Sequence, residues 1–208
     1  MLTNGWKILM AGLVVMVGIR GALADDINPP AWRGAPQTTY QRWEFSTNDP
    51  SPLPDDVDNP YGVYNAEVVP CTAPGWYDSY EGRQGVWELS GAIHAWIANH
   101  DKNWPYKDIW VQLTYFDPQG FGPLVEAIPG MTGGGATLMD RDPAGPIGGW
   151  WYDTWLISLE PNPAEERVDI MGNIWVDEMV IDTICYPEPA TLALVGMGLA
   201  GLALRRRK

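Results

Sequence analysis

The sequence predicts an all-β protein, an antiparallel β-sandwich with a jelly-roll-like arrangement. Segments in which apolar and polar residues alternate recur along the middle of the chain, which is the pattern of half-buried strands. Irregular loops rich in proline, glycine, asparagine and aspartate separate these segments. Only the two end segments carry the long apolar runs expected of helices. Short strands joined by such loops are typical of antiparallel sandwiches.

The first expected strand places Trp43 and Phe45 on one side, and the four prolines of Thr47–Gly62 then predict a loop. A second loop is expected at Thr72–Gly85, and we expect a tight turn at Gly172-Asn173 between the last two strands. The expected strands, in chain order, are Thr39–Ser46, Val63–Val69, Gly85–Ile97, Asp108–Phe116, Leu124–Ile128, Ala136–Met139, Trp151–Leu159, Arg167–Met171 and Asn173–Cys185.

The clearest alternation spans the strands Gly85–Ile97 and Asp108–Phe116. Because these strands follow one another, we expect them to pair as a hairpin. That pairing would place Trp96 near Trp110, and His94 near Gln112, on the face opposite the apolar residues. Two indole rings beside hydrogen-bonding groups suit stacking against sugar rings. The sequence therefore predicts a candidate glycan-binding surface at His94, Trp96, Trp110 and Gln112. In the competing interpretation, the tryptophan-bearing face belongs to the core or lies under a loop.

The region between the two apolar end segments is strongly acidic. Asp25 to Tyr186 holds 7 of the 13 Lys and Arg residues and 25 of the 26 Asp and Glu residues, which gives it a net charge of −18. Such a surface repels nucleic acid and anionic lipids, so we expect no nucleic-acid partner. Eleven of the 12 tryptophans also lie in this region, more than a core of this size requires. Neutral glycans remain candidate partners, whereas acidic polysaccharides would need metal ions to bridge them.

The sequence predicts two further structural sites, each with an alternative interpretation. Cys71 and Cys185 form a candidate disulfide, with two separate buried thiols as the alternative. Asp55, Asp56 and Asp58 form a candidate calcium site because hard cations prefer clustered oxygen ligands, although ordinary solvated acids in a turn explain them too. We expect no cofactor beyond this candidate structural calcium.

We expect no catalytic residues. The sequence has no Gly-x-Ser-x-Gly, no His-Glu-x-x-His and no phosphate-binding loop. The two histidines, His94 and His100, have no obvious third partner for a metal or an acid–base pair. A glycoside hydrolase would need two carboxylates that flank the scissile bond. Asp177-Glu178 and Asp182 on the last strand do not match the Glu-x-Asp-x-x-Glu pattern of laminarinase-like enzymes, yet a secreted glycoside hydrolase remains an alternative function.

The N-terminus has the pattern of a secretory signal peptide over residues 1–24. Lys7 precedes the apolar run Ile8–Ile19, and the small residues Ala22 and Ala24 predict cleavage before Asp25. An uncleaved anchor is the alternative. Either way, Asp25 onward is exported through the secretion machinery. A polar, proline-rich stretch at residues 25–36 predicts a flexible leader, followed by the β domain at residues 37–186.

The C-terminal segment combines three features in order. Pro187-Glu188-Pro189 precedes the uncharged run Ala190–Leu204, and the cations Arg205, Arg206, Arg207 and Lys208 follow. These residues resemble the PEP-CTERM sorting signal of Gram-negative bacteria. An ordinary membrane anchor with an incidental Pro-Glu-Pro is the alternative.

The resemblance implies that the partner is an exosortase, a membrane-embedded cysteine protease that cuts near the Pro-Glu-Pro. The apolar run would hold the chain in the inner membrane as a helix before processing, with the cations on the cytoplasmic side. We therefore expect an exported, non-catalytic protein that reaches the cell surface or extracellular matrix and associates with exopolysaccharide. A carbohydrate-binding module that uses surface tryptophans is the alternative function.

Overall fold

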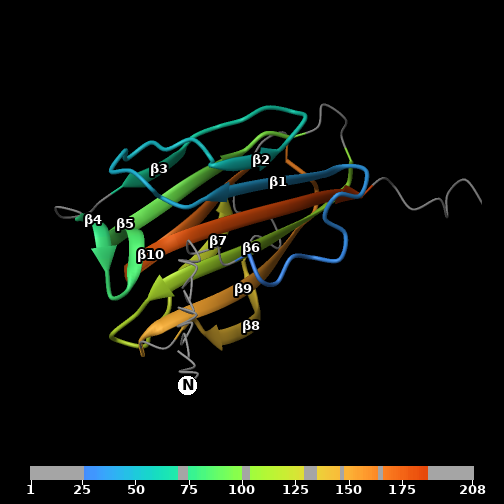
Figure 1. Ribbon diagram of the computed structural model, residues 1–208. Coiled ribbons are helices and arrows are strands. Elements are labelled where there is room, and N and C mark those ends of the chain that lie inside the picture. The colour runs from blue at the N-terminus through green and yellow to red at the C-terminus, as the bar shows by residue number, and fades with distance from the viewer. Residues whose placement is uncertain are drawn as a thin grey trace, which may run out of the picture.

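A computed structural model of the chain describes residues 26–69, 75–99, 104–128, 135–145, 148–163 and 166–186. These residues form one antiparallel sheet of ten strands (Figure 1). The strands are β1 (Thr38–Trp43), β2 (Asp56–Asp58), β3 (Ala66–Val69), β4 (Trp76–Tyr80), β5 (Arg83–Ile97), β6 (Tyr106–Phe116), β7 (Leu124–Ile128), β8 (Thr137–Pro143), β9 (Trp150–Leu159) and β10 (Glu166–Tyr186). The predicted all-β antiparallel fold is confirmed for this part of the chain.

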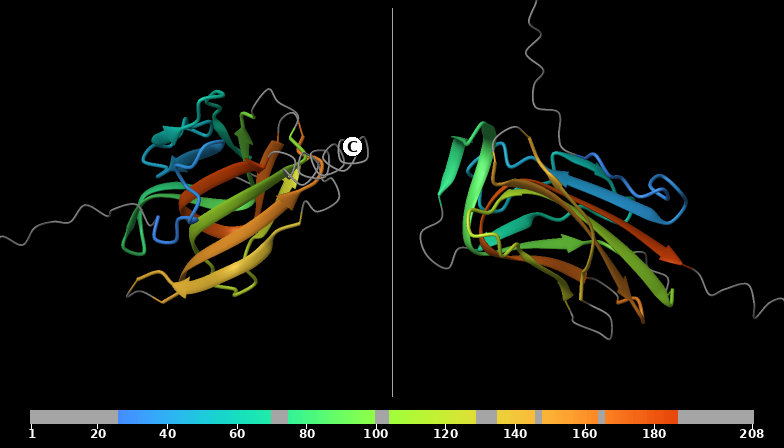
Figure 2. Two further views of the ribbon diagram at one scale, coloured as in Figure 1. Left: turned by 90° about the vertical axis from the view of Figure 1, so that its right-hand side faces the viewer. Right: turned by 90° about the horizontal axis from the view of Figure 1, so that it is seen from below.

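Strand β10 organises the sheet because it pairs with four other strands. Its first half lies between β5 and β7, and its second half lies between β1 and β6. The pairing with β6 shifts register between Val176 and Glu178, which marks a β-bulge at the junction of the two halves. Bulges bend a strand and increase its twist. The long strand therefore joins two differently directed parts of one curved sheet, as the two views of Figure 2 show.

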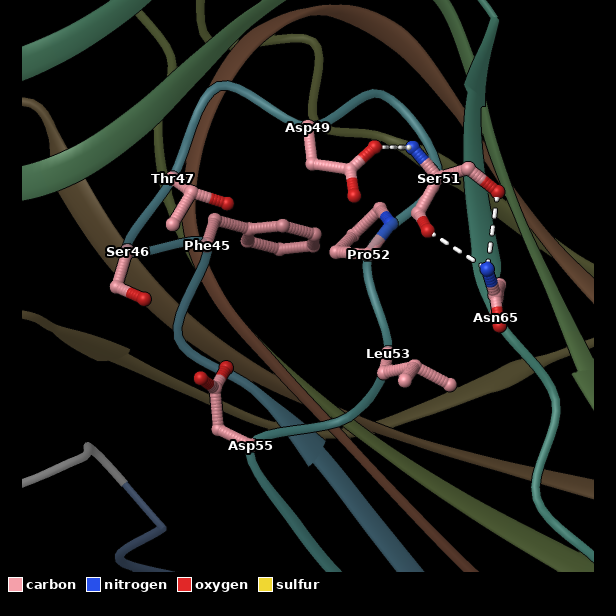
Figure 3. A pocket seen from close by; sticks show the side chains of 9 residues that line it. All are labelled: Phe45, Ser46, Thr47, Asp49, Ser51, Pro52, Leu53, Asp55 and Asn65. Carbon is pink, nitrogen blue, oxygen red and sulfur yellow. Dashed lines mark hydrogen bonds between the residues drawn. The ribbon is translucent and has the colours of Figure 1, made fainter.

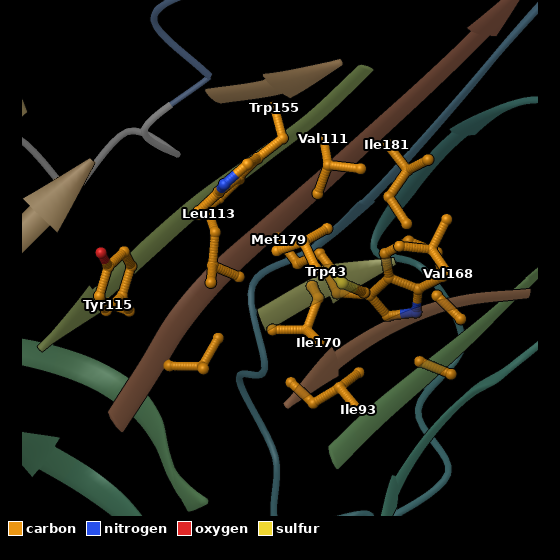
Figure 4. Packing of buried hydrophobic residues seen from close by; sticks show 14 of the residues in the cluster. Trp43, Ile93, Val111, Leu113, Tyr115, Trp155, Val168, Ile170, Met179 and Ile181 are labelled. Atoms are coloured by element: carbon orange, nitrogen blue, oxygen red, sulfur yellow. The ribbon is translucent and has the colours of Figure 1, made fainter. Parts of the chain in front are cut away.

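The curvature lets both halves of β10 contribute to one hydrophobic core. Ile170 from the first half and Ile181 from the second belong to the same buried cluster, together with Ile93 of β5 and Val111 of β6 (Figure 4). Trp43 is fully buried in this cluster. Four tryptophans (Trp43, Trp87, Trp150 and Trp155) lie inside the protein, so the core takes up only part of the tryptophan content.

A buried ion pair joins the two ends of β10. Lys107 of β6 donates to Glu166, the first residue of β10, and both side chains are fully buried. The amide of Asn99 accepts from Lys107 and donates to Glu166 and to the carbonyl oxygen of Pro163, the last at 2.8 Å. Because Lys107 lies beside Cys185 at the far end of β10, this network fixes the start of the strand next to its end.

The predicted alternation is confirmed on the two strongest strands. Trp87, Leu89, Ile93 and Ile97 of β5 are all buried, as are Ile109, Val111, Leu113 and Tyr115 of β6. The strands β7, β8 and β9 lie close to their predicted positions.

Three predictions about connections were wrong. Gly172 and Asn173 do not form a turn, because both lie inside β10 opposite Gly91 and Ser90. The expected loops Thr47–Gly62 and Thr72–Gly85 contain the short strands β2 and β4. The expected hairpin is absent from the described pairings of β5 and β6, because β10 separates the two strands.

The strands form one hydrogen-bonded sheet, and this topology does not confirm the predicted jelly-roll sandwich. The two predicted terminal helices fall in residues 1–25 and 187–208, outside the described part of the chain.

Candidate functional site

A row of ionisable side chains crosses the outer face of the sheet on four neighbouring strands. Glu67 of β3 lies opposite His94 of β5, His94 lies opposite Asp169 of β10, and Asp169 lies opposite Glu126 of β7. Residues directly opposite each other in a sheet share a face. The next row, two residues along the strands, places Trp96 opposite Arg167. The sheet therefore gathers a histidine, a tryptophan, an arginine and three carboxylates on one face.

Asp169 holds this group in a fixed arrangement. Its nearly buried carboxylate hydrogen-bonds the Nδ1 atom of His94 at 2.7 Å and accepts two bonds from Arg167 at 2.6 and 2.7 Å. The Arg167 guanidinium lies over the Trp96 ring at 5.7 Å, and His94 meets that ring edge-on at 6.0 Å. Charge-assisted bonds of this geometry are stronger than neutral ones, and cations favour the faces of aromatic rings. Trp96 is thus positioned by its neighbours rather than left to rotate.

Trp96 borders a shallow hollow of about 430 Å³. The hollow is also lined by Tyr64, which is 46% exposed, and by the polar side chains of Ser51, Asn65 and Glu67. Ligand sites in proteins combine apolar or aromatic walls with a few placed polar groups. This hollow has both.

A second hollow of about 280 Å³ adjoins the first, because Ser51 and Asn65 line both (Figure 3). Asn65 donates to the Ser51 carbonyl oxygen at 2.8 Å and to its hydroxyl group at 3.3 Å, which fixes the boundary between the hollows. Asp49 and Asp55 flank the second hollow from opposite sides, with Phe45 between them in the view of Figure 3. The two hollows together form one groove of mixed polar and apolar lining, to which Trp96 contributes in the first hollow and Asp55 in the second.

The structure separates the four predicted glycan-binding residues into two places. Trp96 lies opposite Arg167, whereas Trp110 lies opposite Asp182, fifteen positions further along β10. The predicted proximity of Trp96 to Trp110, and of His94 to Gln112, was therefore wrong. Only Trp96 and His94 belong to the site at the groove.

Trp110 and Gln112 are covered by the N-terminal segment. The Trp110 indole donates to the Asn28 carbonyl oxygen at 2.9 Å, and the buried Gln112 amide accepts from the Asn28 backbone at 2.9 Å and donates to Asp26 at 2.8 Å. The Tyr152 hydroxyl also contacts the Asn28 backbone, at 3.1 Å. These bonds occupy the polar groups that were expected to face a ligand.

The segment from Asp26 onward is consequently held against the sheet, whereas the sequence predicted a flexible leader. Arg33 pairs with Asp26 and donates to both oxygens of Asp182, at 2.5 and 2.6 Å. Its guanidinium lies over the Tyr40 ring at 4.4 Å. Burial raises the pKa of Asp182 to about 6, although the bonds from Arg33 act in the opposite direction. Local composition misses this docking because the partners lie more than 80 residues away.

The candidate calcium residues do not converge. Asp56 and Asp58 are exposed on β2, and Asp55 accepts the Glu44 backbone N–H at 2.7 Å. Among the residues that the structure describes, no three His, Cys, Asp or Glu side chains are grouped closely enough to hold a metal ion. The calcium site stays a prediction.

Cys185 is buried on β10, and the Asn162 amide approaches its Sγ atom at 3.5 Å. Burial raises the pKa of this thiol. Its predicted partner Cys71 lies outside the described residues, so the disulfide stays a prediction. The same holds for His100 and for the predicted cleavage site at Ala22, Ala24 and Asp25.

Sequence reasoning missed Arg167, Tyr64 and Glu67 at the groove. Arg167 and Asp169 alternate with the apolar Val168 and Ile170, which is a readable signal that both face outward. Nothing local marked Tyr64, because its role depends on where the loop before β3 meets β5.

The comparisons with known proteins identify the C-terminal segment alone. Neither the curated proteins nor the solved structures include a significant match to this chain. No helix within the described ranges has the length and apolar character to cross a membrane. The family model for the PEP-CTERM protein-sorting motif matches residues 187–208, which contain Pro187, Glu188, Pro189 and the cations Arg205 to Lys208. The chain therefore carries a PEP-CTERM protein-sorting motif, the mark of an exported protein that is targeted to an exosortase.

Proposed function

We propose that the β domain is a non-catalytic module that binds neutral polysaccharide at the cell surface, using the groove between Trp96 and Asp55. The observation that carries this proposal is the fixed Trp96 ring beside a hollow that Tyr64 and three polar side chains also line. Sugar rings present apolar C–H faces for stacking and hydroxyl groups for hydrogen bonding, and the groove supplies partners for both.

The charge of the domain supports a neutral ligand. Glu67, Asp49 and Asp55 line the groove, and the exported region carries a net charge of −18. Like charges at an interface cost free energy, so a polysaccharide rich in uronic acids or sulfate would be repelled. Carboxylates instead accept hydrogen bonds well from neutral hydroxyl groups.

The sorting motif supports the place of action. A sorted, exported protein meets polysaccharide at the outer surface. The β domain, a curved sheet that encloses one core like a sandwich, would remain at that surface after an exosortase removes the anchor. We propose that residues 190–204 form the helix that holds the intermediate in the inner membrane. Mass spectrometry of the mature protein should then show the loss of residues 1–24 and of the cationic end. An intact C-terminus in cells with an active exosortase would contradict this processing.

Binding is tested with the Trp96→Ala variant against laminarin, dextran, galactomannan and the exopolysaccharide of the native host, by affinity electrophoresis. Trp96→Ala should weaken binding to the preferred polysaccharide at least tenfold, which is about 1.4 kcal/mol. The matched control is Trp110→Ala, because Trp110 is an equally large ring that lies under the N-terminal segment.

Four outcomes are informative. Equal losses from both variants would place the ligand elsewhere, and no retained polysaccharide would refute the glycan function. Release of reducing ends, lost on Asp169→Asn, would favour the alternative of a glycoside hydrolase. An unfolding temperature that rises with calcium and falls with a chelator would support the structural calcium ion.

A further inference from the structure

The last paired residue of the fold directly precedes the sorting motif. Tyr186 ends β10 opposite Tyr106 of β6, and the motif begins at Pro187. Three residues separate Tyr186 from Ala190, where the uncharged run begins. Four Cα steps span at most about 14 Å. While the apolar run lies in a bilayer, Tyr186 cannot be further than this from the hydrocarbon core.

This distance places the end of the sheet close to the lipid headgroups. The polar layer on each side of the hydrocarbon core is about 5 to 8 Å thick. A folded strand end within about 14 Å of the core therefore lies in this layer or immediately above it. The part of the domain that meets the membrane is set by the sheet, because β6 and β10 are paired up to Tyr106 and Tyr186.

The side chains at this end suit a membrane interface. Tyr106 and Tyr186 are cross-strand partners and are 39% and 36% exposed. Tyrosine is enriched at membrane–water interfaces because its ring is apolar and its hydroxyl group is polar. The two rings are thus presented side by side where the chain leaves the domain.

Two of the acids near this end, Asp108 and Glu166, are engaged within the protein. Asp108 accepts the Ser158 hydroxyl at 2.6 Å and is hydrogen-bonded by Tyr186, and Glu166 pairs with Lys107. Paired acids repel lipid phosphates less than free ones do. The contacts of Asp108 and Glu166 therefore reduce the repulsion between this end of the domain and the lipid phosphates.

We propose that the Tyr106–Tyr186 end of the sheet rests in the lipid headgroup layer while the apolar segment anchors the chain. The proposal rests on the anchored intermediate of the proposed function. In this arrangement the tyrosine pair contacts lipid and restricts the tilt of the domain. The Trp96 groove then keeps a fixed orientation to the membrane.

The test uses the full chain with Tyr106 replaced by the photoreactive aromatic residue benzoylphenylalanine, reconstituted in phosphatidylcholine vesicles. The matched control carries the same residue at Phe121, which is 86% exposed on the loop beyond the other end of β6. The two ends of β6, Tyr106 and Phe116, are ten residue steps apart, about 34 Å. After irradiation, lipid adducts are quantified by mass spectrometry.

We expect at least fivefold more lipid adduct at position 106 than at position 121. Equal yields at the two positions, or no lipid adduct at position 106, would overturn the proposal. In native membranes, an adduct of position 106 to the protease in place of lipid would also overturn it. Flotation of the same vesicles reports anchoring separately: a chain that does not float refutes the anchored intermediate, whereas a floating chain without adducts refutes only the docking.

Discussion

Removing the buried cation Lys107 should be among the most damaging single changes in the protein. Lys107 and Glu166 are both fully buried, and the amide of Asn99 bonds to both. The Lys107→Met variant keeps the volume of the side chain but leaves the Glu166 carboxylate buried without the ammonium group that faces it. Breaking a buried ion pair in this way costs about 3–5 kcal/mol. For a domain of this size, that loss lowers the melting temperature by about 6–20 °C.

The assay is thermal and urea unfolding of the purified protein at pH 7. The matched control is Arg42→Met, which removes the cation of a partly exposed pair with Glu44 at 3.0 Å and should cost less than about 1 kcal/mol. The double variant Lys107→Met/Glu166→Met should recover most of the lost stability, because it removes both charges. If Lys107→Met is no worse than Arg42→Met, the buried pair does not hold the two ends of β10 together.

Two other predictions concern Asp182 and the backbone at Gly85. Burial raises the pKa of Asp182 to about 6 in the folded state. Between about pH 6 and pH 4, the folded state therefore binds a proton that the unfolded chain does not bind. Because of this, the contribution of Asp182 to the free energy of unfolding increases as the pH falls through that window. Asp182→Asn should remove that slope from urea unfolding measured at pH 4, 5 and 6, and an unchanged slope would contradict the assignment. Gly85 has a φ of +74° and an added Cβ would lie 2.7 Å from the Phe45 carbonyl oxygen, so Gly85→Ala should cost about 2–3 kcal/mol. Gly120→Ala, at φ +76° with open space around it, should cost only about 1 kcal/mol, and equal losses would show that the close contact with Phe45 does not matter.

The sequence was informative wherever one face of a strand is buried. In β5 the alternation of Trp87, Leu89 and Ile93 with polar residues reports directly which side faces the core, because side chains on a strand alternate with a period of two. The sorting motif was equally readable, since its three parts are contiguous in the chain.

The pairing of the strands was not readable from the sequence. The hairpin prediction assumed that consecutive strands are neighbours, which holds for most but not all connections. Here β10 enters between β5 and β6, and its length hides the change of partners at the bulge near Val176. A run of alternating residues does not say where its partners change. For this reason the prediction divided β10 at Gly172-Asn173.

The candidate site was predicted in part for the same reason. The outward direction of His94 and Trp96 followed from alternation within one strand. Their actual neighbours, Arg167 and Asp169, come from a strand about 70 residues later. The covering of Trp110 by Asn28 likewise depends on a contact across 82 residues, which no local pattern encodes.

The place of β10 in the chain has a consequence for the order of assembly during secretion. This strand is the last one before the sorting motif, yet β1, β5, β6 and β7 all pair with it. The partners Thr38 and Ile184 are separated by nearly the whole exported region, and such distant pairings make folding slow. The sheet therefore cannot close until residue 186 has been exported. If the apolar run anchors the chain as we propose, the sheet closes only when the anchor has reached the bilayer, and repulsion among the acidic residues opposes aggregation of the open chain until then.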